Sequence, residues 1–156
     1  MAISTKEELQ FLLHRGWEIE KKFESLSAWK GFVSVGPNNR MIVLTLARDS
    51  HKHRVNLERL LKKLDLEAPT NEIPEETFDF TGMLDSEILQ KTIRQDEIVR
   101  DLYTKIVENI DPKLASALSG GKDVEFFYRT LKQMIEDETR HIDMVRKVAG
   151  HITRIQ

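Results

Sequence analysis

The sequence predicts an all-α protein of a single domain, and two observations support this prediction. Four long segments place apolar residues at helical spacing, and the few glycines and prolines, seven and four among 156 residues, fall mostly between those segments. A chain of this length suits one domain and can bury a sizeable core. We therefore expect one four-helix domain over residues 1–156.

The first predicted helix begins at Ser4 or Thr5, each of which precedes a glutamate by three residues, as in a capping box. This helix runs to about Phe32. The sequence GPNN at residues 36–39 then breaks the helical pattern, because glycine and proline interrupt helices.

The second predicted helix runs from about Asn39 to Leu64. Residues 65–82 contain two prolines and no sustained period, so they form a connection. The third helix covers roughly Asp85 to Ile110. After a turn that has room for one short helical piece, the fourth runs from about Asp123 to Ile152.

The connection at residues 65–82 decides between two topologies. It is long enough to travel the length of a bundle, which would leave the second and third helices parallel. The other two connections are short enough to join antiparallel neighbours. An up-down-up-down bundle with a slack middle connection is the alternative, because a long connection permits a crossover without requiring one.

Composition excludes several classes of function. The 24 Lys and Arg and 26 Asp and Glu leave a formal net charge of -2, so no strong field attracts nucleic acid or an anionic membrane. The absence of cysteine excludes disulfides, thiolate zinc sites, iron–sulfur clusters and cysteine nucleophiles. The chain has no basic-then-apolar start and no apolar run of about 18 residues, so we expect a soluble cytoplasmic protein.

The fourth helix carries two polar residues in its apolar stripe. Alternating steps of three and four residues place Glu138 and His141 among seven apolar positions. A carboxylate that is buried without a partner is costly, so Glu138 requires a cation or a proton. The apolar members of the stripe are Val124, Phe127, Leu131, Met134, Val145, Val148 and Ile152.

The second helix repeats this pattern, because Ser50 and His53 interrupt its apolar stripe and again lie three residues apart. The sequences DSHKH at residues 49–53 and DETRH at residues 137–141 share Asp first, a basic residue fourth and His fifth. This similarity indicates an internal repeat between the two halves of the chain.

The first and third helices each carry one inward carboxylate, Glu20 and Asp96. Tyr103 lies seven residues after Asp96 on the same face. Its hydroxyl can hydrogen-bond a metal ligand on a facing helix, or it can simply find a partner nearby. All four predicted helices therefore bring polar residues to the middle of an apolar seam.

This set of residues is suited to binding metal. Residues three apart on a helix reach the same point, so a Glu-x-x-His pair can hold an ion. Carboxylate oxygens and imidazole nitrogens suit iron or manganese, and such a cation would neutralise Glu138. Other ionisable residues fall off the stripes and are not assigned to the site: His14, His51, His151, Glu24 and Asp49.

The constellation resembles that of the ferritin-like superfamily, particularly the short rubrerythrin-like proteins, over nearly the whole chain. The resemblance is carried by Glu20, His53, Asp96 and the sequence ETRH at residues 138–141, in the family's order of carboxylate, Glu-x-x-His, carboxylate, Glu-x-x-His. It implies a ferritin-like four-helix bundle with a long crossover between helices two and three. It also implies a dinuclear iron or manganese centre, with the metal ligands Glu20, His53, Asp96, Glu138 and His141.

The sequence departs from the family pattern at two positions. Ser50 stands where the family has its first bridging glutamate, and Asp96 is shorter than the usual glutamate. Two divalent ions bring four positive charges, whereas Glu20, Asp96 and Glu138 supply three negative ones. Three outcomes are consistent with this difference in charge. The metal ions bind more weakly, only one ion binds, or a bridging hydroxide replaces the missing carboxylate. Ser50 can hydrogen-bond a bound water or hydroxide.

The leading hypothesis is a metalloprotein for iron handling or for peroxide and oxygen defence, acting as an oxidase or peroxidase with an external electron donor. The alternative is a non-catalytic helical scaffold or interaction protein, in which His53 and His141 pair with the carboxylates and no metal binds. The family resemblance also predicts a homodimer. Five aromatic residues can cover an intersubunit face or pack in the core: Trp17, Trp29, Phe32, Phe126 and Phe127.

Overall fold

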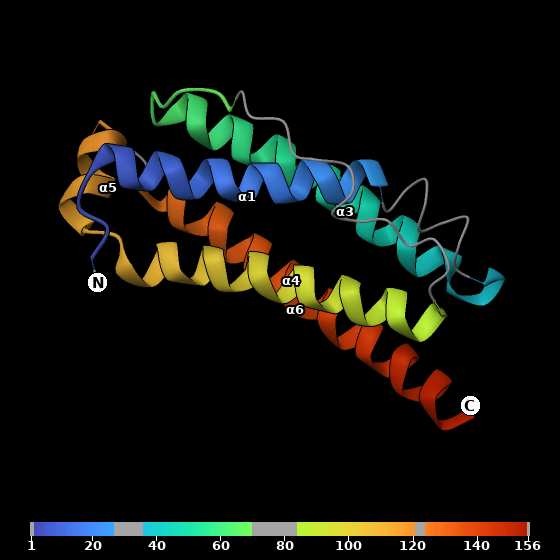
Figure 1. The fold of residues 1–156 in the computed structure, drawn as a ribbon. Coiled ribbons are helices and arrows are strands. Elements are labelled where there is room, and N and C mark those ends of the chain that lie inside the picture. Colours follow the sequence, from blue (N-terminus) through green and yellow to red (C-terminus); the bar gives the residue numbers. More distant parts are fainter. Residues whose placement is uncertain (1, 27–35, 70–83, 121–123, 156) are drawn as a thin grey trace.

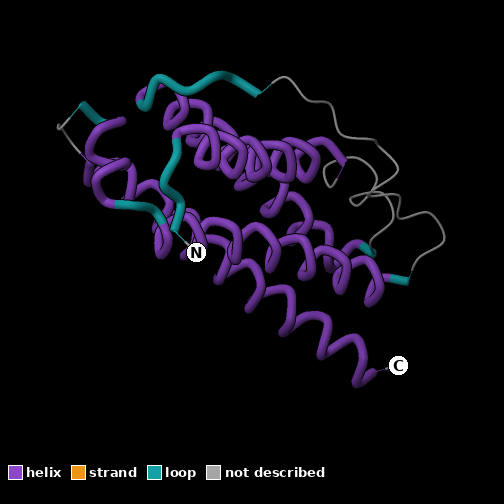
Figure 2. Tube along the Cα trace, turned by 60° about the vertical axis from the view of Figure 1, so that its left-hand side comes forward, coloured by secondary structure: helices purple, strands orange, loops and turns teal. Residues whose placement is uncertain are grey.

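The computed structural model describes residues 2–26, 36–69, 84–120 and 124–155. Within these ranges the chain is almost entirely helical and contains no named strand, as Figure 2 shows. The all-α prediction is therefore confirmed. None of the described helices combines the length and the apolar character that crossing a lipid bilayer requires.

The helices begin and end close to the predicted residues. A short helix is also present between the third and fourth long helices, where the sequence has room for one. The predicted end of the first helix near Phe32 lies outside the described residues. In chain order the elements are α1 (Lys6–Leu26), η2 (Pro37–Asn39), α3 (Arg40–Lys63), α4 (Asp85–Asn109), α5 (Pro112–Leu118) and α6 (Val124–Ile155).

Local hydrogen bonds explain two of the helix ends. The Oγ1 atom of Thr5 accepts a hydrogen bond from the backbone N–H of Glu8 at 3.2 Å, which caps the start of α1. After α3, the backbone N–H of Leu66 donates to the carbonyl of Leu61 at 2.8 Å. Asp65 lies between these two residues with φ of 56°, so α3 ends in a Schellman turn with aspartate in the usual glycine place.

The four long helices pack as two antiparallel pairs (Figure 1). Helix α1 lies along α3, and α4 lies along α6. The pairs are joined because α1 also contacts α4, and α3 also contacts α6. Followed along the chain in Figure 1, α3 and α4 run in the same direction, and so do α1 and α6. Each of these contacts therefore joins helices of opposite direction around one shared interior.

Apolar side chains fill this interior in two separate clusters. The first cluster takes its residues from the beginning of α1, the end of α3, the end of α4 and the beginning of α6, and it includes Leu13, Leu60 and Leu131. The second cluster takes its residues from the opposite halves of the same helices, such as Phe23 and Ile93. Buried polar residues occupy the middle of all four helices, so they form a layer between the two clusters.

The aromatic residues considered for an intersubunit face fall into three groups. Trp17 and Phe127 are 7% and 1% exposed and belong to the first apolar cluster, so they are core residues. Phe126 is half-buried against the same cluster, and the Lys63 ammonium lies 3.8 Å from the centre of its ring. The remaining two, Trp29 and Phe32, lie outside the described residues.

Candidate metal centre

The structure brings the five residues of the sequence-derived ligand set into the polar layer. Each long helix contributes at least one of them, and α6 contributes two. All five are buried, with between 0% and 5% of their surface exposed. They are Glu20 on α1, His53 on α3, Asp96 on α4, and Glu138 and His141 on α6.

These residues form two groups of three with the geometry of a metal site. Glu20, His53 and Glu138 each offer a ligand atom within 4.8 Å of the others, and so do Asp96, Glu138 and His141. Glu138 belongs to both groups. One carboxylate can therefore bridge two ions, each of which would also have one imidazole and one further carboxylate.

Two carboxylate oxygens in this layer have no hydrogen-bond donor within the described part of the chain. They are Oδ2 of Asp96 and Oε2 of Glu138, and both are fully buried. Nδ1 of His141 lies 3.6 Å from Oε2 of Glu138, beyond hydrogen-bond distance. Buried carboxylate oxygens without a donor are expensive, so these oxygens favour the binding of a proton or of a metal cation.

His53 turns one ring nitrogen to the centre and the other to an aspartate. Its Nδ1 lies 2.9 Å from Oε1 of Glu138 and 3.3 Å from Oε1 of Glu20. Its Nε2 donates to Oδ2 of Asp137 at 2.9 Å. Because Asp137 occupies Nε2, the ring presents Nδ1 as the nitrogen available to a metal ion.

His141 is held in the same way from the opposite side. Its Nε2 donates to Oδ2 of Asp49 on α3 at 2.6 Å, and its Nδ1 faces Glu138. The aspartate at the start of each repeat sequence therefore accepts a hydrogen bond from the histidine at the end of the other. Asp49 on α3 holds the histidine of α6, and Asp137 on α6 holds the histidine of α3.

Sequence reasoning did not assign these two aspartates to the site. Asp137 is 1% exposed, and besides His53 it contacts Gln133 and Arg140. Asp49 lies off the helical stripe, as counted, but its side chain still reaches the neighbouring helix. The repeat itself was the signal that could have found them, because DSHKH and DETRH both begin with aspartate.

Tyr103 fixes the carboxylate of Glu20. Its side chain is completely buried, and its hydroxyl donates to Oε1 of Glu20 at 2.9 Å. The ring has room because residue 16 is glycine. A Cβ atom added at Gly16 would lie 2.8 Å from Cε1 of Tyr103. Glycine on α1 therefore allows this tyrosine on α4 to reach its carboxylate.

The pKa values of the groups in this layer are shifted, some upward and some downward. Burial and the charge of Glu138 raise the pKa of Glu20 to about 7, and the same two causes raise the pKa of Asp96 well above its usual range. Burial opposes the ionisation of Glu138, yet the neighbouring imidazoles of His141 and His53 lower its pKa to about 2. Burial also opposes the charging of His53, but its bonds to Asp137, Glu138 and Glu20 raise its pKa to about 12. The layer therefore favours bound positive charge.

The remaining ionisable residues singled out in the sequence lie away from this centre. Glu24 accepts hydrogen bonds from His51 at 2.5 Å and from Arg54 at 2.6 Å, on the surface between α1 and α3. His14 contacts the backbone carbonyl of Glu67 at 2.6 Å. The side chain of His151 lies outside the described residues.

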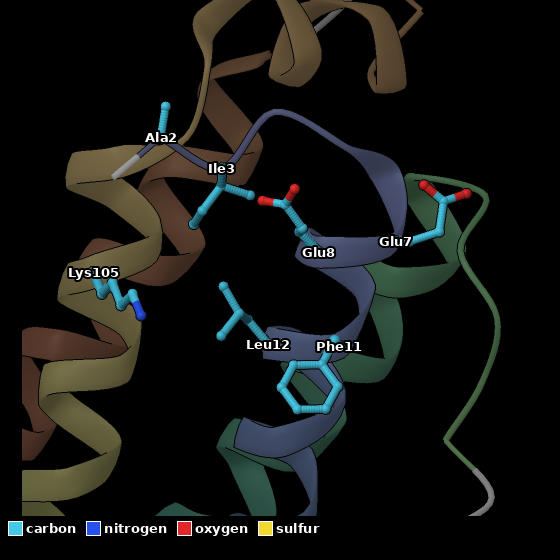
Figure 3. A pocket seen from close by; sticks show the side chains of 7 residues that line it. All are labelled: Ala2, Ile3, Glu7, Glu8, Phe11, Leu12 and Lys105. Atoms are coloured by element: carbon cyan, nitrogen blue, oxygen red, sulfur yellow. The ribbon is translucent and has the colours of Figure 1, made fainter.

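A pocket of about 620 Å³ lies where the N-terminal segment meets the first turns of α1 and the end of α4. In Figure 3, Ile3, Leu12 on the α1 side and Lys105 on the α4 side border an open space, whereas Glu7 points away from it. The pocket contains no histidine and shares no residue with the polar layer, so it is separate from the candidate metal centre. It is lined by Ala2, Ile3, Glu7, Glu8, Phe11, Leu12 and Lys105.

Comparison of the chain with protein-family models, with curated proteins and with solved structures gives no match. The chemistry of the centre is therefore inferred from its ligand pattern and geometry. Two groups of buried carboxylates and imidazoles, which share one carboxylate, are each candidates to hold a metal ion.

Proposed function

We propose that this protein is a ferritin-like metalloprotein whose interior holds an iron or manganese centre of two ions. In this proposal the four long helices form a bundle with a crossover between α3 and α4. The protein acts in iron handling or in defence against peroxide and oxygen, as an oxidase or peroxidase with an external electron donor. The homodimer and the cytoplasmic location stay predictions from the family resemblance and from the composition.

The observation that carries this proposal is the pair of ligand groups that share Glu138. Ligands from all four helices converge on one buried layer, and Asp96 and Glu138 each keep one oxygen without a donor in the described structure. A buried ion network that served stability alone would gain from donors at these oxygens, because unsatisfied buried charges are costly. A bound cation accounts for these two oxygens better than a purely stabilising role does. The common direction of α3 and α4 in Figure 1 supports the proposed crossover.

The residues have separate tasks in this proposal. Glu20, His53 and Glu138 would hold one ion, and Asp96, His141 and Glu138 the other. When bound, such ions supply the redox chemistry that passes electrons to peroxide or oxygen. The apolar clusters on both sides keep water out of the layer, which strengthens its electrostatic interactions.

Residues beyond the ligands keep this set in position. Asp137 and Asp49 occupy the Nε2 atoms of the two histidines, so Nδ1 remains directed at the centre. Tyr103 holds one oxygen of Glu20 by its hydroxyl and so limits the positions of that carboxylate. Such partners typically contribute about 10–100-fold to metal affinity.

Metal stoichiometry in ligand variants tests the proposal. We expect the wild-type protein, loaded with Mn(II) or with Fe(II) without oxygen, to bind up to two ions per chain and to melt at a higher temperature. Glu138→Gln removes the shared ligand and should weaken both ions. Glu20→Gln should weaken one ion and leave the other. Elemental analysis after gel filtration counts the ions, and Glu136→Gln, an exposed position on the same helix, is the matched control.

The alternative function predicts a different result. If His53 and His141 only pair with the carboxylates, the wild-type protein carries no metal and neither ion raises its melting temperature. Glu138→Gln and Glu136→Gln then differ in stability alone. That outcome would identify a helical scaffold and reject the metalloprotein.

A further inference from the structure

Ser50 occupies the place in the centre where the internal repeat has a carboxylate in its other half. The repeat pairs Ser50 with Glu138, just as it pairs Asp49 with Asp137 and His53 with His141. The crossed aspartate–histidine hydrogen bonds follow this pairing between α3 and α6. Ser50 therefore lies on α3 at the position that corresponds to the shared ligand on α6.

The Ser50 side chain is buried close to the histidine of the same helix. It is 5% exposed and lies one turn before His53 on the inward face of α3. A serine hydroxyl can donate a hydrogen bond to an anion.

The predicted ligand set has fewer negative charges than two divalent ions carry positive ones. Its carboxylates, Glu20, Asp96 and Glu138, carry three negative charges at most, against four positive charges. A further anion in contact with the ions would therefore strengthen the binding of the second ion. A glutamate side chain exceeds a serine side chain by about the size of a formate ion, so formate is the anion that best matches the difference between the two side chains.

We propose that a small carboxylate-type anion binds beside Ser50 together with the metal ions and replaces the missing bridging side chain. This inference rests on the proposed function, because the neighbouring carboxylates would repel an anion in the absence of metal. The Ser50 hydroxyl donates a hydrogen bond to the anion. Metal and anion therefore bind cooperatively, and each raises the affinity for the other by the same factor.

Mn(II) titrations with and without sodium formate test this inference. Free Mn(II) is measured by its electron paramagnetic resonance signal, with sodium perchlorate at equal ionic strength as the control. We expect formate to raise the affinity for the second ion about tenfold or more, within the usual range of coupling between sites. Perchlorate should have no such effect, because it is a poor ligand.

Variants at Ser50 separate the charge from the hydroxyl. Ser50→Glu restores the carboxylate, so it should bind the second ion tightly without formate. Ser50→Asp offers a shorter carboxylate in case glutamate disturbs packing. Ser50→Ala keeps the space but loses the donor, and should retain only part of the formate effect. Thermal melting of each variant without metal checks that it folds.

The outcomes distinguish the two proposals. If the wild-type protein binds one or two Mn(II) ions with the same affinity in formate and perchlorate, the anion site is rejected and the metal centre stands. If neither the wild-type protein nor Ser50→Glu binds Mn(II), both proposals are rejected. Formate dependence that Ser50→Glu abolishes supports the anion site.

Discussion

The contact between Gly16 and Tyr103 illustrates how single residues support the centre. Glycine within a helix costs about 1 kcal/mol relative to alanine, so α1 has a less stable residue at this position. The absent Cβ atom lets the tyrosine ring approach and its hydroxyl reach Glu20 at 2.9 Å. Gly16 therefore helps to position the carboxylate of Glu20 through Tyr103, and it does not stabilise α1.

Gly16→Ala should destabilise the protein despite the higher helix propensity of alanine. The new Cβ atom would lie 2.8 Å from Tyr103 Cε1, inside a fully buried environment. We expect the free energy of unfolding to fall by about 1–3 kcal/mol, as for other overpacked core positions. Urea denaturation of the metal-free protein followed by circular dichroism measures this change.

The same substitution in a Tyr103→Leu protein tests whether contact with the tyrosine ring causes the loss of stability. In Tyr103→Leu the ring is gone, so Gly16→Ala should become neutral or stabilising through its helix propensity. An equal loss of stability in both backgrounds would contradict the assigned contact.

At the scale of elements, α3 and α6 brace each other through the repeated Asp-x-x-x-His pattern. Each helix supplies a histidine to the centre and an aspartate to the histidine of the other helix. The two braces differ in their surroundings, because the side chain of Asp137 is 2% exposed and that of Asp49 is 23% exposed. The two halves of the centre are therefore similar in pattern and unequal in burial.

Asp137→Asn and Asp49→Asn should each weaken a different metal ion. Asp137 braces the histidine of the Glu20 group, and Asp49 braces the histidine of the Asp96 group. We expect a loss of affinity of about 10–100-fold for the ion of that group, with the other ion less affected. Stepwise Mn(II) binding curves measure both affinities.

The exposed Asp143 on α6 offers the matched control, since Asp143→Asn removes the same charge away from the layer. Equal weakening of both ions by all three substitutions would indicate a general charge effect and would contradict the brace.

At the scale of the whole molecule, the polar layer divides the core into two apolar clusters. Such a layer is unfavourable for the metal-free protein, because buried ionic groups lose hydration that their mutual attraction only partly restores. Replacement by apolar residues of similar size is often neutral or stabilising. This cost is the reason why we propose a bound metal for the layer.

Conversion of the layer into apolar core should raise the stability of the metal-free protein by about 1–4 kcal/mol and abolish its response to metal. Urea denaturation with and without Mn(II) measures both effects. Tyrosine is changed as well, because its hydroxyl would lose its acceptor. The variant carries Glu20→Leu, His53→Leu, Asp96→Val, Tyr103→Phe, Asp137→Ala, Glu138→Leu and His141→Leu. Asp137 is included because the loss of His53 would leave its buried carboxylate without that partner.

Glu138→Ala provides the comparison, since it leaves two histidines without their shared carboxylate and should be less stable than wild type. A fully apolar variant that is also less stable than wild type would mean that the polar layer itself stabilises the fold. That result would favour the scaffold over the metalloprotein.

The sequence by itself determined the helical class, most of the helix boundaries and the inward face of each long helix. These features follow from local periodicity and from capping and turn residues, which act within a few positions of the chain. For the same reason Glu20, His53, Asp96, Glu138 and His141 could be assigned to the interior from their spacing alone.

Only the tertiary structure decided how those residues meet. A count along one helix places Asp49 off the stripe, but α6 lies beside that edge of α3 and brings His141 to 2.6 Å from its carboxylate. The sharing of Glu138 between two ligand groups and the approach of Tyr103 to Gly16 depend in the same way on neighbouring helices. Distances between helices arise from packing of distant segments, which no periodicity within one segment contains.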